Sequence, residues 1–412
     1  MNILIVTQYY PPEFRGIAYS VAHDLADRGH RVRVITGFPN YPTGKIYEGY
    51  TQSWRHYERD GKVQVLRVPL YADHSYTAIK RVANYLSFGL SSAGARKFAR
   101  GADVIYVYAT QMTANIGPWL WRLTGGASYV AHIQDLWPES IVGSSLVGGT
   151  IRSKIIEAVL APWLSSIYKH AGAVIGIAPT MVRLLEDRGS PKQRTHLIYN
   201  WGEDLSGDKV DRSLRPSTGG TLKLLLAGNL GDMQGIETVL EAMSHLVDLE
   251  VKLTIAGDGV ASEKLRSYAT ELSLTNVSFV GRIDPSNIWR YYLDADFSLV
   301  TLKNLEVFRG TIPSRFQAAL AHGVPVITNV AGDLSDLVRT NEIGFVASPE
   351  DPVSLSKAIR SAYELSVVER NDLSMRAFAS YASKFSRKAG IDAMEKLLIG
   401  AALEAQQNKV RK

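Results

Sequence analysis

The chain lacks cysteine entirely, although it has 412 residues. Disulfides, thiolate metal sites and cysteine nucleophiles are therefore excluded, which fits a reducing compartment such as the cytoplasm. The first residues, MNILIVTQ, have neither a basic leader nor a long apolar core, so we expect no signal peptide. The longest uncharged stretch, residues 104–121, contains amides, hydroxyls and a proline and does not resemble a membrane span. We expect a cytoplasmic protein.

A dinucleotide-binding fingerprint is also missing. Two loops that contain glycine follow apolar strands, at residues 8–16 and 228–235, but neither spells G-x-G-x-x-G. This argues against a nicotinamide-dependent oxidoreductase, although two parallel-sheet domains would suit one. Only generic positive charge favours nucleic acid, and no binding module for it is recognisable, so we expect no such partner.

Positive charge is in modest excess and unevenly distributed. The formal net charge is +6, which favours an anionic partner such as a nucleotide or a membrane surface. No acidic residue occurs between Asp73 and Asp103. Within this segment, cations flank apolar side chains; they are Lys80, Arg81, Arg96, Lys97 and Arg100 beside Ile79, Val82, Leu86 and Leu90. The segment 80–100 is typical of a basic amphipathic helix on the inner face of a membrane. The alternative is a solvated helix whose apolar face belongs to the core.

Apolar strands alternate with helical patterns along the whole chain and predict an α/β fold with two mostly parallel sheets. The predicted strands are 2–7, 31–36, 63–68, 103–108, 128–133, 173–178 and 195–199, then 222–227, 251–256, 277–280, 297–301, 324–328 and 343–347. Residues 206–221 read as a linker, since they are rich in charge, serine and glycine. We expect a first domain over 1–205, completed by a C-terminal helix over about 386–412, and a second over 222–385.

The order of motifs resembles the GT-B glycosyltransferases of family 4 over nearly the whole chain. The matching segments are YYPPEFRG, LADRGHRVRVIT, HIQDLWPES, YNWGED, AGNLGDMQGIETVLEA, IAGDG, FVGRI, LDADFSLV, IPSRF and LAHGVPVIT. FPNYPTGKIYEGY and QDLWPES look most like bacterial capsule, colanic acid and O-antigen transferases.

The resemblance implies two doubly wound, Rossmann-like domains that face one another across a cleft. It also implies transfer, with retention of configuration, of a hexose or N-acetylhexosamine from a nucleotide-diphosphate sugar. Uridine diphosphate (UDP) is the expected nucleotide, on family frequency alone. The acceptor would be a saccharide or a lipid-linked molecule of surface polysaccharide or glycoconjugate synthesis. No metal or other cofactor is expected.

In the first domain the resemblance singles out residues on two loops. Gly16 would let the backbone approach the donor diphosphate or the acceptor, although turn geometry alone can require a glycine there. Arg15 can pair with phosphate or simply be solvated. His132 and Asp135 follow a predicted strand, where open α/β sheets place ligands. They would orient or deprotonate the acceptor hydroxyl and bind sugar hydroxyls, respectively, unless His132 is only structural.

Two further first-domain residues are candidates for the acceptor side. Asn200 stands in YNWGED, and Trp137 stands in HIQDLWPES. Trp137 precedes Pro138, and we expect the pair to shape the loop rather than to stack on sugar.

In the second domain this chain departs from the family pattern. Most relatives have an arginine after the first glycine of the loop and a lysine before its last glycine. Here these positions hold Asn229 and Gln234, with Gly231 between them. Amides donate hydrogen bonds but cannot neutralise a departing diphosphate. We therefore expect another cation to compensate; the candidates are Arg282, Arg309 and, as first choice, Arg315, oriented by helix capping through Ser314.

A second departure concerns two glutamates that many relatives carry eight positions apart. The corresponding residues here are Gly310 and Ala318, and Glu306 is a nearby substitute unless it is merely solvated. These losses keep open a non-catalytic GT-B protein that binds a sugar nucleotide or scaffolds a membrane complex. Asp294 and Asp296 form an Asp-x-Asp pair, which we interpret as structural rather than as a metal site.

Overall fold

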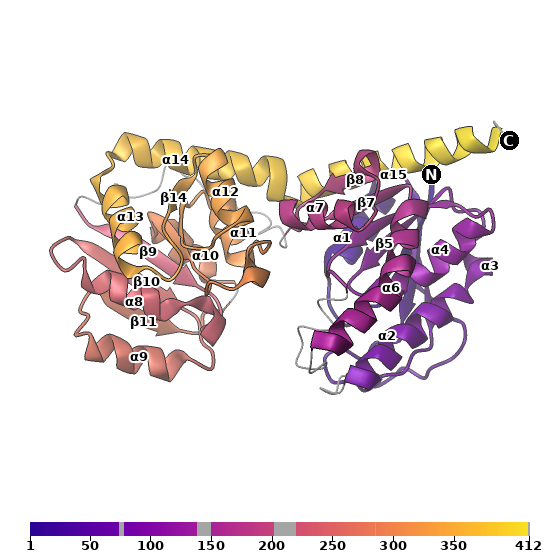
Figure 1. Ribbon diagram of the computed structural model, residues 1–412, viewed down its shortest axis with the longest axis horizontal. Helices are drawn as coiled ribbons and strands as arrows, with labels where there is room; N and C mark the ends of the chain where they lie inside the picture. Colours follow the sequence, from indigo (N-terminus) through magenta and orange to yellow (C-terminus); the bar gives the residue numbers. More distant parts are fainter. Residues whose placement is uncertain (74–77, 138–149, 202–219, 285, 411–412) are drawn as a thin grey trace. The chain divides into compact units, whose positions relative to one another are not determined.

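The computed structural model describes residues 1–73, 78–137, 150–201, 220–284 and 286–410. The chain forms two compact units, whose helices and strands are drawn in Figure 1. Unit 1 is Met1–Asn200 with Gly390–Lys412, and unit 2 is Trp201–Ala389. Most of the predicted linker, up to residue 219, falls outside the described residues.

Unit 1 is built on a sheet of eight strands in the order β3-β4-β2-β1-β5-β6-β7-β8. Its strands are β1 Asn2–Val6, β2 Arg31–Gly37, β3 His56–Asp60, β4 Val63–Val68, β5 Val104–Ala109, β6 Ser128–Ile133, β7 Ala173–Gly176 and β8 Thr195–Leu197. Its helices are α1 Ile17–Asp27, α2 Ala78–Ala93, α3 Arg96–Ala99, α4 Ile116–Leu123, α6 Thr150–His170 and α7 Pro179–Asp187. All strand pairs are parallel except β3 with β4. The parallel α/β prediction is therefore confirmed, while β3 was missed.

The strand β3 has no apolar alternation that a sequence pattern could reveal. Its sequence is HYERD, and it lies at the edge of the sheet, half exposed. A buried cation secures it, because Arg67 of β4 is only 1% exposed and its Nη2 lies 2.5 Å from Glu58 Oε1. The second terminal nitrogen of the guanidinium, Nη1, donates to the Gly37 carbonyl at 3.0 Å.

The last helix, α15 Arg387–Val410, packs on unit 1 over most of its length. Its Ile391, Met394 and Leu398 are fully buried at helical spacing. Arg28, which follows α1, pairs with Asp392 and Glu395 at 2.6 Å each, so both apolar and ionic contacts attach the helix to this unit.

Unit 2 has a six-stranded, wholly parallel sheet in the order β11-β10-β9-β12-β13-β14. The strands are β9 Leu222–Ala227, β10 Val251–Ala256, β11 Val277–Gly281, β12 Phe297–Val300, β13 Val326–Thr328 and β14 Gly344–Val346. The helices are α8 Ile236–Ser244, α9 Ser262–Glu271, α10 Ile288–Asp294, α11 Ser314–Ala321, α12 Asp333–Thr340, α13 Pro352–Glu364 and α14 Val367–Ser380. The predicted strands of this half are all present.

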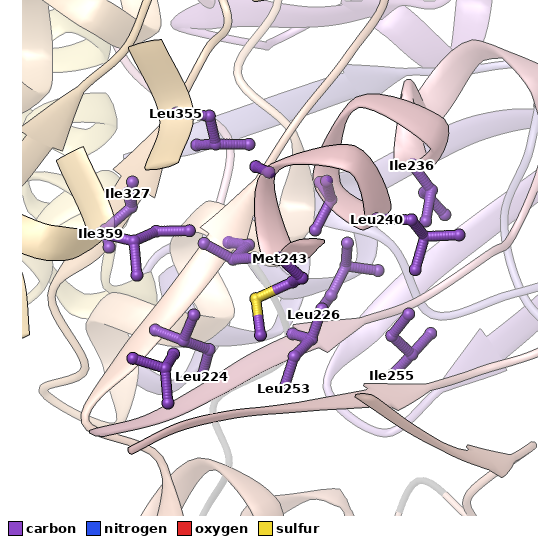
Figure 2. Close-up of a cluster of buried hydrophobic side chains, with 14 of the residues drawn as sticks. Leu224, Leu226, Ile236, Leu240, Met243, Leu253, Ile255, Ile327, Leu355 and Ile359 are labelled. Carbon is purple, nitrogen blue, oxygen red and sulfur yellow. The ribbon is translucent and has the colours of Figure 1, made fainter. Parts of the chain in front are cut away.

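The core of unit 2 forms where α8 and α13 cover one face of the sheet. Figure 2 shows Leu240 and Met243 of α8 and Ile359 of α13 above the strand residues Leu226 and Leu253. All five are fully buried. This packing fixes α8 against β9, and thereby fixes the loop that joins them.

Replacing Leu240 by alanine tests this anchor. The cavity should lower the free energy of unfolding of unit 2 by about 2–5 kcal/mol. Hydrogen exchange of the β9 amides, read by mass spectrometry, should accelerate accordingly. Val247→Ala is the control because Val247 is 74% exposed, and unchanged exchange in Leu240→Ala would contradict the packing described.

Candidate functional site

A cleft of about 1160 Å³ opens in unit 2 where four parallel strands end. Residues following β9, β10, β11 and β12 line it, together with the start of α11. Open α/β sheets bind ligands at this edge, where the strand order reverses. In this sheet the reversal lies between β9 and β12.

Gly228 and Gly257 allow the loops after β9 and β10 to pack closely at the base of the cleft. A Cβ on Gly257 would lie 1.8 Å from the Gly228 carbonyl oxygen, so no larger residue fits without moving the backbone. Gly257 also has φ +151°, and its N–H donates to the Gly281 carbonyl at 2.8 Å. The loops after β9, β10 and β11 are therefore held side by side.

Arg315 of α11 lies against the loop after β9. Its Nη2 donates to the Asn229 backbone oxygen at 3.4 Å, and its Nη1 is buried without a hydrogen-bond partner. Burial lowers the pKa of Arg315, whereas Tyr292 acts in the opposite direction. An arginine nonetheless stays charged near neutral pH. The cleft thus contains a positively charged side chain, Arg315, that is fixed in place and has one hydrogen-bond donor without a partner.

The two amides that replace the expected cations both line the cleft. The Gln234 Oε1 accepts a hydrogen bond from the Gly231 N–H at 2.9 Å, so this side chain closes its own loop. Gly231 itself does not line the cleft. The side chain of Asn229 lies beside Gly259. A Cβ added to Gly259 would lie 2.7 Å from Asn229 Oδ1.

The structure separates the three candidate cations. Arg282 and Arg315 both line the cleft. Arg309 instead pairs with Glu306 at 3.0 Å, and both side chains are largely exposed, at 52% and 86%. Neither residue of this pair lines the cleft. Arg315 is therefore the cation that adjoins the loop of Asn229 and Gln234.

The predicted capping by Ser314 is wrong. The residue that caps α11 is Pro313, and no side chain accepts a hydrogen bond from the first turn. Ser314 is the first helical residue and lines the cleft. Arg315 is held instead by its contact with the Asn229 carbonyl and by burial near Tyr292.

Acidic side chains are scarce around the cleft. Ala318 lines it, whereas Gly310 does not. Asp258 is the acid in the lining, and its Oδ1 accepts hydrogen bonds from Gly259 N–H at 2.8 Å and Ser262 Oγ at 2.6 Å. The balance of charge in the lining is positive, which suits an anion.

The Asp-x-Asp pair binds Lys223 at the start of the central strand β9. Asp294 pairs with Lys223 Nζ at 2.5 Å, and Asp296 accepts from the Lys223 backbone N–H at 2.8 Å. Arg370 approaches Asp296 at 4.0 Å. Within the described part of the chain, no three histidine, aspartate or glutamate side chains gather as metal ligands would.

In unit 1, His132 ends up at the carboxyl end of β6 and is fully buried. Its Nδ1 shares a hydrogen bond with the Tyr106 hydroxyl at 2.8 Å, and its Nε2 has no partner. Burial lowers its pKa to about 3. The imidazole is therefore neutral and a weak base, so orienting a hydroxyl suits it better than removing a proton.

Other predicted residues gather near the same strand end. Burial raises the pKa of Asp135, and Arg81 of α2 partly offsets this effect. The Asn200 Nδ2 donates to Gln134 Oε1 at 2.7 Å, and its own Oδ1 is buried without a partner. Trp137 is 5% exposed with its ring 6.2 Å from that of Tyr85, so it offers no free face; Pro138 lies outside the described residues.

Gly16 is extended, with φ −94°, so neither positive φ nor a tight turn explains it. A Cβ there would lie 2.5 Å from the ring of Phe14, a 41% exposed side chain that would have to move aside. Arg15 stacks on the Tyr19 ring at 5.2 Å. Whether either residue meets a ligand stays a prediction.

The sequence reasoning missed an aromatic pair in the cleft of unit 2. Tyr292 and His322 stack with centroids 4.7 Å apart and planes 7° from parallel. Both line the cleft, and burial raises the pKa of Tyr292 to about 12. They lie on the ends of α10 and α11, far apart in sequence, so no local pattern could have revealed them.

Comparisons with known proteins agree with this geometry. The family model described as "Glycosyl transferases group 1" matches residues 211–382, and "Glycosyl transferase 4-like domain" matches residues 17–201. The chain belongs to the group 1 glycosyltransferases. It is 29% identical over 379 residues to the putative colanic acid biosynthesis glycosyl transferase WcaI of Escherichia coli, covering 88% of this chain and 92% of that one.

Further relatives of this glycosyltransferase are more distant. The probable glycosyltransferase WbjE of Pseudomonas aeruginosa is 24% identical over 60% of this chain and 62% of its own. Among solved structures, HepE of Anabaena in complex with UDP and glucose aligns with a TM-score of 0.61 at 18% identity, covering 97% of this chain and 99% of that one. The outer core galactosyltransferase WaaB aligns with a TM-score of 0.64 at 14% identity, covering 97% and 99%. These structures show a GT-B fold, as predicted.

The glycosyltransferase assignment favours an enzyme of bacterial polysaccharide synthesis over the non-catalytic alternative. Across the described residues, no helix is both long enough and apolar enough to cross a membrane.

The titration of His132 is a direct test of the first-domain site. Because burial lowers its pKa from 6.5 to about 3, folding disfavours its protonation. Its contribution to stability is present above pH 6.5 and is lost as the pH falls below that value. The imidazole NMR signals, assigned by their absence in His132→Gln, should therefore stay constant between about pH 8 and pH 5. A midpoint near 6.5 would contradict the buried geometry.

Proposed function

We propose that this enzyme moves a hexose or N-acetylhexosamine from a UDP sugar to a saccharide or lipid-linked acceptor, with retention of configuration, in the synthesis of a bacterial surface polysaccharide or glycoconjugate. The observation that carries the donor assignment is the unpartnered Nη1 of Arg315 in the cleft of unit 2. A half-buried guanidinium whose buried Nη1 has no partner suits a diphosphate, which accepts charge-assisted hydrogen bonds.

Several features of the cleft favour a diphosphate beside Arg315. Arg282 supplies a second cation at the lining, and Gln234 and Asn229 supply amides. The start of α11 adds backbone N–H groups without a capping side chain. A helix start of this kind favours negative charge.

Transfer requires that the bond between sugar and phosphate loosen. Negative charge then grows on the departing UDP, and Arg315 together with the helix starts would stabilise it. The acceptor hydroxyl attacks from the face that UDP leaves, and a phosphate oxygen of the donor takes its proton. This route needs neither a carboxylate nucleophile nor a metal. The anomeric coupling constant of the product, measured by NMR, tests it; an inverted product would contradict retention.

One comparison supports UDP as the nucleotide. HepE of Anabaena, whose fold is similar, was solved in complex with UDP and glucose.

Unit 1 is proposed to hold the acceptor. Asp135 and the free Oδ1 of Asn200 can accept hydrogen bonds from sugar hydroxyls, and the neutral His132 can orient one through Nε2. The pKa of Asp135 is raised mainly by burial, which Arg81 partly offsets. A carboxylate held in this way suits hydrogen bonding to hydroxyl groups.

We also propose contact with the inner face of the membrane through residues 80–100. The absence of acidic residues between Asp73 and Asp103 supports attraction to anionic lipid. Co-sedimentation with vesicles of phosphatidylglycerol and phosphatidylethanolamine tests this contact, and protein that stays wholly in the supernatant would contradict it.

Substitution of Arg315 tests the donor site. Arg315→Ala should weaken UDP binding, measured by isothermal titration calorimetry, by about 10–100-fold, because a charged hydrogen bond is lost. Arg315→Lys should weaken it less, since the charge remains.

Arg309→Ala is the matched control, because Arg309 pairs with Glu306 outside the cleft lining. UDP affinity should not change in this variant. If Arg315→Ala and Arg309→Ala lost equal UDP affinity, Arg315 would not be the residue that binds the phosphate. If the parent protein bound no nucleoside diphosphate, the donor assignment would be refuted.

A further inference from the structure

Helix α2 has two faces with different surroundings. Asn84, Phe88 and Ser92 are at most 1% exposed and form the inner face. Val82, Leu86 and Leu90 recur every four residues on the outer face and are 41%, 43% and 58% exposed. The core therefore does not account for this apolar stripe, and the alternative in which the apolar face is buried is wrong for these three residues.

Exposed aromatic residues lie beside the end of α2. Trp54 and Tyr57 are 72% and 61% exposed. They surround a hollow of about 160 Å³ together with Ser91 and Lys97. Tryptophan and tyrosine with an exposed ring are typical of the boundary between water and lipid. We call Val82, Leu86, Leu90, Trp54 and Tyr57 the apolar patch.

The charges around the apolar patch are positive. Arg55, Arg96, Lys97 and Arg100 are all exposed. Lys80 is exposed as well but pairs with Asp73 at 3.2 Å, so its charge is partly compensated. An apolar strip bordered by cations is complementary to an anionic bilayer, whose headgroups attract the cations while the acyl boundary takes the strip.

Exposed apolar residues also occur elsewhere on unit 1, so exposure alone does not identify a membrane-binding surface. On α15, Ile399 and Leu403 are 38% and 52% exposed and also lie four residues apart. Lys396 and Glu404 stand beside this pair in the sequence and their charges balance, while Glu395 is already paired with Arg28. The pair therefore lacks the excess of positive charge that borders Leu86 and Leu90, which makes it a matched control for them.

The inner face of α2 contacts residues of the proposed acceptor side. Asn84 Oδ1 accepts a hydrogen bond from Gln8 Nε2 at 2.6 Å, and Gln8 lies just beyond the end of β1. The Tyr85 ring lies 6.2 Å from that of Trp137, beyond the end of β6. The helix therefore joins the apolar patch to the strand ends where His132 and Asp135 lie.

We propose that α2 lies flat in an anionic lipid surface, with Val82, Leu86 and Leu90 inserted at the boundary of headgroups and acyl chains and with Trp54 and Tyr57 beside them. This rests on the proposed membrane contact and goes further, because it replaces purely electrostatic adsorption by partial insertion of a defined helix face.

The first test is co-sedimentation with vesicles of phosphatidylglycerol and phosphatidylethanolamine. Leu86→Glu/Leu90→Glu should reduce the partition coefficient by about tenfold or more, because apolar burial is lost and negative charge is added. Ile399→Glu/Leu403→Glu should bind like the parent protein. Binding of the α2 variant equal to that of the parent would overturn the insertion while leaving the contact standing, whereas no binding by the parent would overturn both.

The absence of cysteine allows a second, direct test. An environment-sensitive fluorophore attached to Leu90→Cys should shift its emission to the blue on addition of these vesicles, and the same label on Leu403→Cys should not. Neutral phosphatidylcholine vesicles should produce no shift at either site. An unshifted label at position 90 on bound protein, as in docking of a protein partner or adsorption by charge alone, would overturn the proposal. UDP titration of the Leu86→Glu/Leu90→Glu variant should match the parent, which separates this test from that of the donor site.

Discussion

The cleft of unit 2 depends on the close approach of the loops that follow β9 and β10. Gly257 could not carry a Cβ, since it would meet the Gly228 carbonyl oxygen at 1.8 Å. The hydrogen bond from Gly228 N–H to the Ala256 carbonyl, at 2.9 Å, continues the register of the two strands into their loops. The strand ends thus present backbone rather than side chains to the cleft, which leaves room for a ligand next to Arg315.

In the proposed donor site, Arg315 alone would supply the positive charge that the resemblance assigned to two side chains. Asn229 and Gln234 lack the charge expected in the loop, and Gln234 is engaged with Gly231. Arg315 comes from another element, α11, yet it touches the backbone of Asn229. A positive charge can therefore be supplied to the same place by a helix that approaches from the side. This makes the departure from the family pattern compatible with the enzyme assignment.

Much of the fold could be predicted, because buried parallel strands appear as apolar runs that need no tertiary information. Leu222–Ala227 and Val251–Ala256 are examples with correct bounds. The strand at His56–Asp60 was missed because it is polar and lies at the edge of the sheet, where only its pairing with the next strand and the ion pair of Glu58 with Arg67 hold it.

The same distinction holds for the sites. The placement of Arg315 in its motif was enough to nominate it, but its support came from Asn229 and Tyr292 rather than from Ser314, because Pro313 occupies the capping position. The stacking of Tyr292 on His322 joins two helices that are separated in the sequence, so no local sequence pattern could indicate it. The exposure of Leu90 likewise depended on which face of α2 the sheet covers.

The most direct test of the account is a crystal structure of the protein with UDP. The account predicts the diphosphate within hydrogen-bond distance of Arg315 Nη1, with Asn229 and Gln234 beside it. A diphosphate bound elsewhere, with Nη1 still lacking a partner, would contradict the central claim that Arg315 supplies the charge missing from the loop.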